Sequence, residues 1–197
     1  MSPHQSPNDP MYQVDIANNQ SCLKLTANYV RKVVRQTLKL EEVAEANISI
    51  AIVDDAAIHD VNRRFLKHDS PTDVISFLFQ ESGGASMSAT DQATRPRGAG
   101  KTIAGEIVVS AETAVSMAQD IGWSATEELT LYLVHGLLHV CGYDDLKKSE
   151  LKVMRARERV VMESLGLNIP PRDDEQPTAK KKAAIKRTTS KAKGATS

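Results

Sequence analysis

The sequence predicts a single compact domain of the α+β class, a mixed sheet of about four strands packed with helices on its faces. Three observations support this prediction. The 197 residues suffice for one domain with tails. Their periodic segments follow the order β-α-β-α-β-β-α-α-α. One segment, residues 124–142, is apolar nearly all round at helical spacing, which indicates a helix in the interior.

The first half of the chain alternates strands and helices. YQVDIAN, residues 12–18, alternates as a half-buried strand does, and residues 23–39 carry apolar side chains at helical spacing. The β-branched run ISIAIVDD, residues 48–55, predicts a second strand. AAIHDVNRRFL, residues 56–66, predicts a helix, and DVISFLF, residues 73–79, predicts a third strand.

The second half begins with a stretch that has no periodicity. Residues 80–101 are rich in Gly, Ser, Ala and Thr, and they predict a long mobile loop within the domain. TIAGEIVVS, residues 102–110, predicts a fourth strand. Residues 112–122 predict a helix that ends at a glycine, and an amphipathic segment over about residues 147–165 predicts the last helix.

The interior helix over residues 124–142 has signals at both ends. Ser124 is followed three residues later by Glu127, which forms a capping box at the start. Gly142 favours the left-handed conformation that ends a helix. We therefore expect this helix to be the centre of the core.

Both ends of the chain differ in composition from the domain between them. We expect residues 1–11 and 171–197 to be disordered, which leaves residues 12–170 as the folded domain. Residues 172–197 contain eight Lys/Arg and three Asp/Glu, a net charge of +5, so the rest of this net-neutral chain carries −5. The basic tail is typical of a nucleic-acid-binding arm, and a merely solubilising tail is the alternative.

The composition also bears on the location of the protein. No apolar run approaches the roughly 18 residues that a membrane span needs, and no signal peptide is visible. Cys22 and Cys141 lie far apart and outside any CxxC pair, which favours two buried thiols in a reducing compartment. We therefore expect a cytoplasmic protein without a membrane partner.

The run HGLLHVCGYDD, residues 135–145, predicts a metal site. His135 and His139 are four residues apart, so both imidazoles point the same way from a helix and can reach one ion. Gly142 lets the chain fold back, and Asp144 and Asp145 follow where a third ligand is needed. Two imidazoles that only fill a core are the alternative.

The residue after the first histidine matters for the chemistry. In HExxH metalloproteases this residue is a glutamate that acts as general base, whereas here it is Gly136. Proteolysis is therefore disfavoured. Three protein ligands with one open position still describe a catalytic zinc site.

At this point the sequence resembles a known family. HGLLHVCGYDD resembles the HGxLHLxGYDH signature of the YbeY family of bacterial rRNA-maturation endoribonucleases. NRRFLKHDSPTDVISF, residues 62–77, is similar to the family's N…D-x-PTDVLSF block, and GEIVVSAETA, residues 105–114, to its GDIxIS…T segment. The three blocks come in family order, and the resemblance covers about residues 12–168.

The resemblance implies a compact α+β metalloprotein with one zinc ion held by three histidines at the end of a buried central helix. The first two ligands fall on His135 and His139, and the third falls on Asp145, where this sequence departs from the family. Aspartate is a legitimate zinc ligand. We expect the neighbouring Asp144 to orient a ligand or to cap the turn. Nickel or manganese can bind the same set of donors.

A second departure concerns an arginine that the resemblance links to RNA cleavage. Many relatives carry Tyr-Arg where this chain has Phe65 and Leu66. Arg63 and Arg64 are candidates to supply the positive charge, and His68 in the following loop is a candidate acid, base or phosphate contact. The alternatives are a solvated basic helix edge and a structural loop histidine.

The function implied by the resemblance is cleavage of single-stranded RNA by a zinc-dependent hydrolase, in late maturation of the small-subunit rRNA 3′ end and in ribosome quality control. Single-stranded RNA, small-subunit rRNA and ribosomal proteins are the implied partners. A non-catalytic, metal-stabilised ribosome-assembly factor is the alternative, and a metal-dependent hydrolase of another substrate is a third possibility. The sequence does not predict an oligomeric state.

Overall fold

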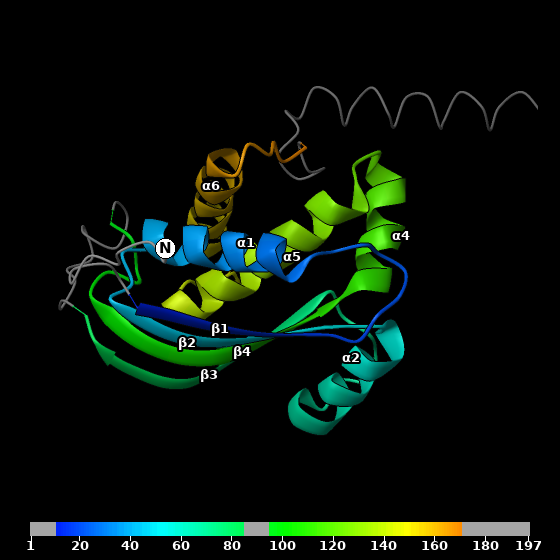
Figure 1. The fold of residues 1–197 in the computed structure, drawn as a ribbon, viewed down its shortest axis with the longest axis horizontal. Helices are drawn as coiled ribbons and strands as arrows, with labels where there is room; N and C mark the ends of the chain where they lie inside the picture. The colour runs from blue at the N-terminus through cyan, green and yellow to red at the C-terminus, as the bar shows by residue number, and fades with distance from the viewer. Residues whose placement is uncertain (1–10, 85–94, 171–197) are drawn as a thin grey trace, which may run out of the picture.

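The computed structural model describes residues 11–84 and 95–170 (Figure 1). Its elements follow the predicted order of strands and helices, with one short π-helix added. They are β1 Met11–Asn18, α1 Ala27–Leu40, β2 Glu45–Val53, α2 Asp55–Val61, the π-helix η1 Asn62–Leu66, β3 Val74–Gly83, β4 Lys101–Ser110, α4 Ala111–Ile121, α5 Ala125–Cys141 and α6 Lys148–Ser164.

The strands form the mixed four-stranded sheet that the sequence predicts. Their order across the sheet is β1-β2-β4-β3. β1 pairs with β2 in parallel and β2 with β4 in parallel, whereas β3 pairs antiparallel with β4. β3 and β4 follow each other along the chain and pair antiparallel, and β3 is an edge strand of the sheet.

The helices cover the two faces of the sheet unequally. α1, α4, α5 and α6 lie over one face, and α2 lies on the other face at one end (Figure 1). The burial of β2 shows the same difference between the two faces, because Ile48 and Ile50 are fully buried while Asn47 is exposed. On the second face, Ile58 of α2 packs in a small cluster with Ile75 of β3. Helices on both faces were expected, but the second face is covered only there.

α5 is the centre of the core, as its sequence predicts. It contacts α1, α4, α6, β3 and β4, and Leu133 and Leu137 are fully buried. The capping box of Ser124 and Glu127 is present, and Gly142 ends the helix at a φ of 105°. None of the helices in the described ranges is long and apolar enough to cross a membrane.

The predicted helix over residues 56–66 is divided in two. α2 ends at Val61, and the chain continues as η1 to Leu66 before Lys67 takes a left-handed conformation with a φ of 60°. Buried Asn62 donates a side-chain hydrogen bond to the carbonyl of Ser70 at 2.8 Å. Widened π-helical turns are rare and frequently occur at functional sites.

The structure differs from the predicted loop over residues 80–101 at both of its ends. β3 continues to Gly83, and β4 begins at Lys101. Residues 80–83 of this edge strand are exposed and carry no apolar alternation, so their sequence has no strand signal. Residues 85–94 lie outside the described ranges, as do residues 1–10 and 171–197; Met11 belongs to β1.

Two smaller expectations are also corrected. α1 begins at Ala27, after the Thr26 side chain accepts a hydrogen bond from the backbone of Tyr29, and not at residue 23. Both cysteines are free thiols, but only Cys141 is buried and Cys22 is exposed. Cys22 lies in the irregular segment before α1, where no periodic pattern indicates burial.

Candidate metal centre

The three predicted ligands meet at the C-terminal end of α5. The Nε2 atoms of His135 and His139 are 3.0 Å apart. Asp145 places Oδ2 3.8 Å from Nε2 of His135 and Oδ1 4.0 Å from Nε2 of His139. One ligand atom from each residue lies within 4.8 Å of the others, so the three form a group that could hold a metal ion.

A tight turn after α5 brings Asp145 to the histidines. The backbone of Tyr143 donates to the carbonyl of Leu138 at 3.0 Å as the helix ends. The Asp144 carboxylate then accepts hydrogen bonds from the backbone N–H groups of Leu146 and Asp145, and these bonds lower the pKa of Asp144. Asp144 therefore caps the turn, as expected.

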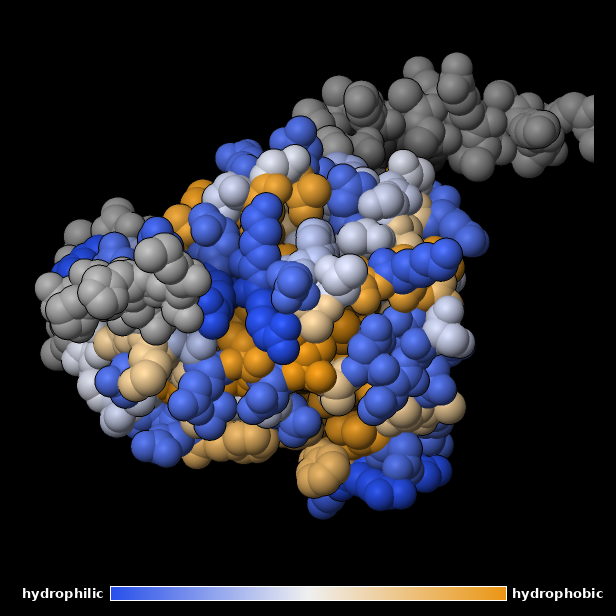
Figure 2. All heavy atoms as spheres, viewed as in Figure 1, coloured by the Kyte–Doolittle hydropathy of each residue, from blue (hydrophilic) through white to orange (hydrophobic). Residues whose placement is uncertain are grey.

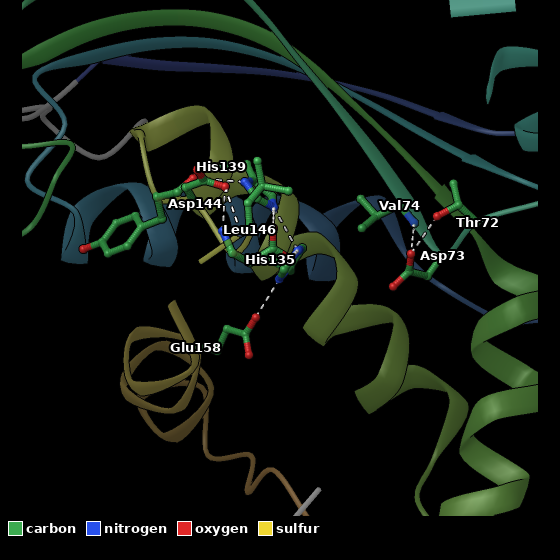
Figure 3. A network of polar contacts seen from close by, with 10 residues as sticks. Thr72, Asp73, Val74, His135, His139, Asp144, Leu146 and Glu158 are labelled. Atoms are coloured by element: carbon green, nitrogen blue, oxygen red, sulfur yellow. Dashed lines mark hydrogen bonds and ion pairs between the residues drawn. The ribbon is translucent and has the colours of Figure 1, made fainter. Parts of the chain in front are cut away.

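The hydrogen bonds of the imidazoles indicate where their protons lie. Nδ1 of His139 is 3.0 Å from the carbonyl oxygen of Tyr143, which can only accept. Nδ1 of His135 is 2.6 Å from Oε1 of Glu158, a carboxylate on α6 that is 3% exposed (Figure 3). With Nδ1 assigned as the donor in both contacts, each imidazole in its neutral form keeps a lone pair at Nε2.

Two lone pairs and a carboxylate thus converge on one point. Lone pairs 3.0 Å apart repel each other unless a proton or a cation lies between them. Burial lowers the pKa of His139, and a charge on the neighbouring His135 ring would lower it further; both effects favour the neutral form of His139 that binds metals. The donor set and its protonation therefore fit a metal ion, with two imidazoles and one carboxylate as ligands.

Sequence reasoning missed Glu158. It accepts from the ligand histidine across 23 residues of sequence and completes a carboxylate–histidine pair of the kind that orients metal ligands. The available signal was its position, because Glu158 belongs to the buried stripe of α6 with Met154, Val161 and Met162. An acidic residue in such a stripe needs a partner inside the molecule.

Sequence reasoning also missed Arg97, which holds the turn from the segment before β4. Its guanidinium donates to the carbonyl of Gly142 at 3.2 Å and to Glu150 at 2.6 Å, and it lies 4.9 Å from the centre of the Tyr143 ring. No local pattern could have indicated this contact, since the partners are at least 45 residues away in sequence.

The structure explains the glycine after the first histidine. A Cβ atom at Gly136 would lie 2.9 Å from Cγ2 of Ile107 and 3.0 Å from Cγ2 of Val74. Position 136 therefore faces β3 and β4 at close range, on the sheet side of α5. No side chain at this position can serve the metal centre without moving the helix away from the sheet.

The three predicted catalytic residues lie on η1 and in the loop that follows it. Arg63 and Arg64, on η1, are largely exposed, and each pairs with one carboxylate oxygen of Asp60, at 2.8 and 2.7 Å. His68 is exposed in the loop that follows. The group of possible metal ligands found in the described residues does not include His68. Leu66, at the position where the resemblance implies an arginine, is 47% exposed.

The fold and the donor set define a class of small α+β proteins with three potential metal ligands at the end of a buried helix. A family model described as Endoribonuclease YbeY matches residues 15–166. The chain belongs to the YbeY family.

Three curated relatives named Endoribonuclease YbeY illustrate the match. The protein of Desulfitobacterium hafniense is 38% identical over 126 residues, which are 64% of this chain and 76% of the relative. That of Rhodopirellula baltica is 34% identical over 78% of this chain and 72% of its own length. That of Moorella thermoacetica is 36% identical over 70% and 85%. The solution structure of TM1509 from Thermotoga maritima aligns with a TM-score of 0.49 and 19% identity, over 78% of this chain and 91% of that one.

Proposed function

We propose that this protein is a zinc-dependent endoribonuclease that cleaves single-stranded RNA, in late maturation of the small-subunit rRNA 3′ end and in ribosome quality control. One observation carries the proposal. Two imidazole lone pairs and the carboxylate of Asp145 converge at one point, in a chain whose relatives are named endoribonucleases. Small-subunit rRNA and ribosomal proteins in the cytoplasm are the proposed partners.

His135, His139 and Asp145 would hold one metal ion, and imidazole donors favour zinc. When bound, the ion supplies a Lewis acid that polarises a phosphoryl oxygen and stabilises the charge that develops on it. The protein groups around the ion orient the imidazole ligands through hydrogen bonds at Nδ1. Glu158 and the carbonyl of Tyr143 hold the imidazole protons at Nδ1, so neither ring has to change its tautomer.

The basic residues of η1 and the following loop are the proposed contacts to the RNA backbone. Arg63 and Arg64 share the single carboxylate of Asp60, so the cluster keeps an excess positive charge for a phosphate. His68 is the third member of this proposed contact. They would take the place of the arginine that many relatives carry at position 66.

Metal content and RNA cleavage, measured on the same samples, test the proposal. We expect about one zinc ion per chain in the wild type and cleavage of a labelled single-stranded RNA. His139→Ala and Asp145→Ala should lose most of the metal and the cleavage. Asp120→Ala, which removes an exposed carboxylate on α4, is the matched control and should keep both.

Two results contradict the proposal in different ways. Cleavage that persists in a folded His139→Ala variant points to a contaminating nuclease. Bound zinc without cleavage by the wild type favours the second candidate, a non-catalytic assembly factor whose metal stabilises the fold. The leucine at position 66, in place of the relatives' arginine, is the observation that supports this second candidate.

A further inference from the structure

All three phenylalanines of the chain form one cluster, which we name the phenylalanine platform. The rings of Phe65, on η1, and Phe77, on β3, meet edge to face with centroids 5.6 Å apart. The ring of Phe79 stacks on that of Phe77, with centroids 6.4 Å apart and planes inclined by 9°. Figure 2 shows apolar surface at the lower edge of the molecule, over η1 and β3.

Two rings of the platform are exposed. Phe65 is 67% exposed and Phe79 is 66% exposed, although phenylalanine is among the residues that are most often buried. Phe77 is half-buried and packs against the small cluster of Ile58 and Ile75 beneath α2. Phe77 therefore anchors the platform in the fold, and the other two rings are exposed to solvent.

Basic side chains of η1 adjoin the platform, while Glu106 of β4 lies opposite Phe77. Phe65 lies on the same short helix as Arg63 and Arg64, and Lys67 follows at its end. Asp60 is shared by the two arginines, so these four side chains carry an excess of positive charge. Aromatic rings beside cationic side chains match a single strand of nucleic acid, whose bases stack on the rings and whose phosphates attract the cations.

The platform and the candidate metal centre lie on opposite sides of one edge strand. Val74, at the start of β3, faces α5 at Gly136. Gly136 lies between His135 and His139 in the sequence. Ile75 and Phe77 belong to the cluster on the opposite face of the sheet. A single-stranded RNA that passes over the exposed edge of β3 would contact both faces of the sheet. Exposed aromatics on an open sheet face are a known means of binding single-stranded RNA.

We propose that the phenylalanine platform stacks bases of the single-stranded RNA substrate and thereby binds the strand beyond the metal centre. This inference rests on the proposed function, because it assigns a binding surface to that substrate. The platform binds any base sequence, since every base has a face that can stack. It requires unpaired bases, because the bases of a duplex are already stacked on each other.

Binding of a fluorescein-labelled RNA strand of about 16 nucleotides, followed by fluorescence anisotropy without cleavage in chelator-treated protein, tests the platform. We expect Phe65→Ala combined with Phe79→Ala to weaken binding by at least about tenfold, because each stacked base contributes separately. Phe65→Trp combined with Phe79→Trp keeps the aromatic faces and should bind about as well as the wild type. Met117→Ala, at another exposed apolar residue, is the control and should leave binding unchanged.

A strand of the same length without bases separates stacking from charge. The wild type and the double alanine variant should bind this abasic strand equally, because only phosphates remain to be recognised. An equal loss of affinity for both strands would overturn the platform, and so would unchanged RNA binding by the double alanine variant. The latter result is also expected if the platform binds a protein.

The outcome for the platform is distinguishable from that for the proposed function. If RNA binding depends on the two rings but the zinc-loaded wild type does not cleave RNA, the platform proposal stands and the proposed nuclease function is contradicted. If cleavage depends on the metal but RNA affinity does not depend on the rings, the proposed nuclease function stands and the platform proposal is overturned. Thermal unfolding of each variant checks that removal of two exposed rings leaves the fold intact.

Discussion

At the scale of single residues, Glu158 orients His135, one of the three potential metal ligands, through a contact of 2.6 Å. Its buried carboxylate lies 2.6 Å from Nδ1 of His135 and orients the ring so that Nε2 faces His139 and Asp145. A buried carboxylate without a partner is costly, so the pair is also part of the packing of α6 on α5. Glu158 thus both packs in the core between α5 and α6 and orients His135.

The change Glu158→Gln keeps the shape of the side chain and removes its negative charge. We expect zinc affinity to fall by about 10- to 100-fold, the usual effect of losing such an outer partner. Competition with a chelator of known affinity measures the change. Glu163→Gln, at an exposed position of the same helix, is the control and should bind zinc as the wild type does. Unchanged zinc affinity in Glu158→Gln would mean that the residue serves only the packing.

At the scale of elements, the close approach of α5 to the sheet positions the centre. Gly136 permits this approach, because a Cβ atom there would lie 2.9 Å from Cγ2 of Ile107, closer than real Cβ atoms come to other atoms, and 3.0 Å from Cγ2 of Val74. The same helix carries both histidines, so any shift of α5 moves the ligands relative to the turn that carries Asp145. The absence of a glutamate at position 136 is therefore a consequence of packing.

The change Gly136→Ala tests this packing. Helix propensity alone favours alanine by about 1 kcal/mol, but an extra methyl group in a filled core typically costs about 1–3 kcal/mol. We expect a net decrease in the free energy of unfolding, measured by urea denaturation of the metal-free protein. Lys152→Ala, at an exposed position of α6, should stay within about 0.5 kcal/mol of the wild type. A more stable Gly136→Ala variant would show that the sheet yields easily at this point.

At the scale of the whole molecule, charge is separated along the chain. Residues 172–197 carry a net charge of +5 and the rest carries −5. An acidic body repels RNA at long range, so we propose that the basic tail tethers the enzyme to rRNA or the ribosome. The tail lies outside the described residues and outside the family match.

Deletion of residues 173–197 removes seven Lys/Arg and tests the tether. We expect weaker RNA binding at low salt and a smaller difference at high salt, because phosphate neutralisation releases counterions and is salt-dependent. The measurement is the slope of log affinity against log salt concentration for the full chain and the deletion. A tail of equal length with glutamine in place of Lys and Arg separates charge from length. Equal affinity of all three proteins at low salt would exclude the tether.

The sequence by itself determined what depends on neighbours along the chain. The four-residue spacing of His135 and His139, the helix stop at Gly142 and the family resemblance indicated the donor set before any contact was visible. The order of strands and helices followed from periodicity in the same way. Edge strand β3 was underestimated because its exposed residues 80–83 carry no apolar pattern.

The tertiary structure alone decided what depends on contacts between distant segments. The partner of His135 comes from α6, 23 residues later, and Arg97 reaches the turn from 45 residues before it. The phenylalanine platform joins η1 to β3 across the loop between them. Such contacts have no local signature, because each residue follows an ordinary pattern in its own segment and only packing brings the side chains together.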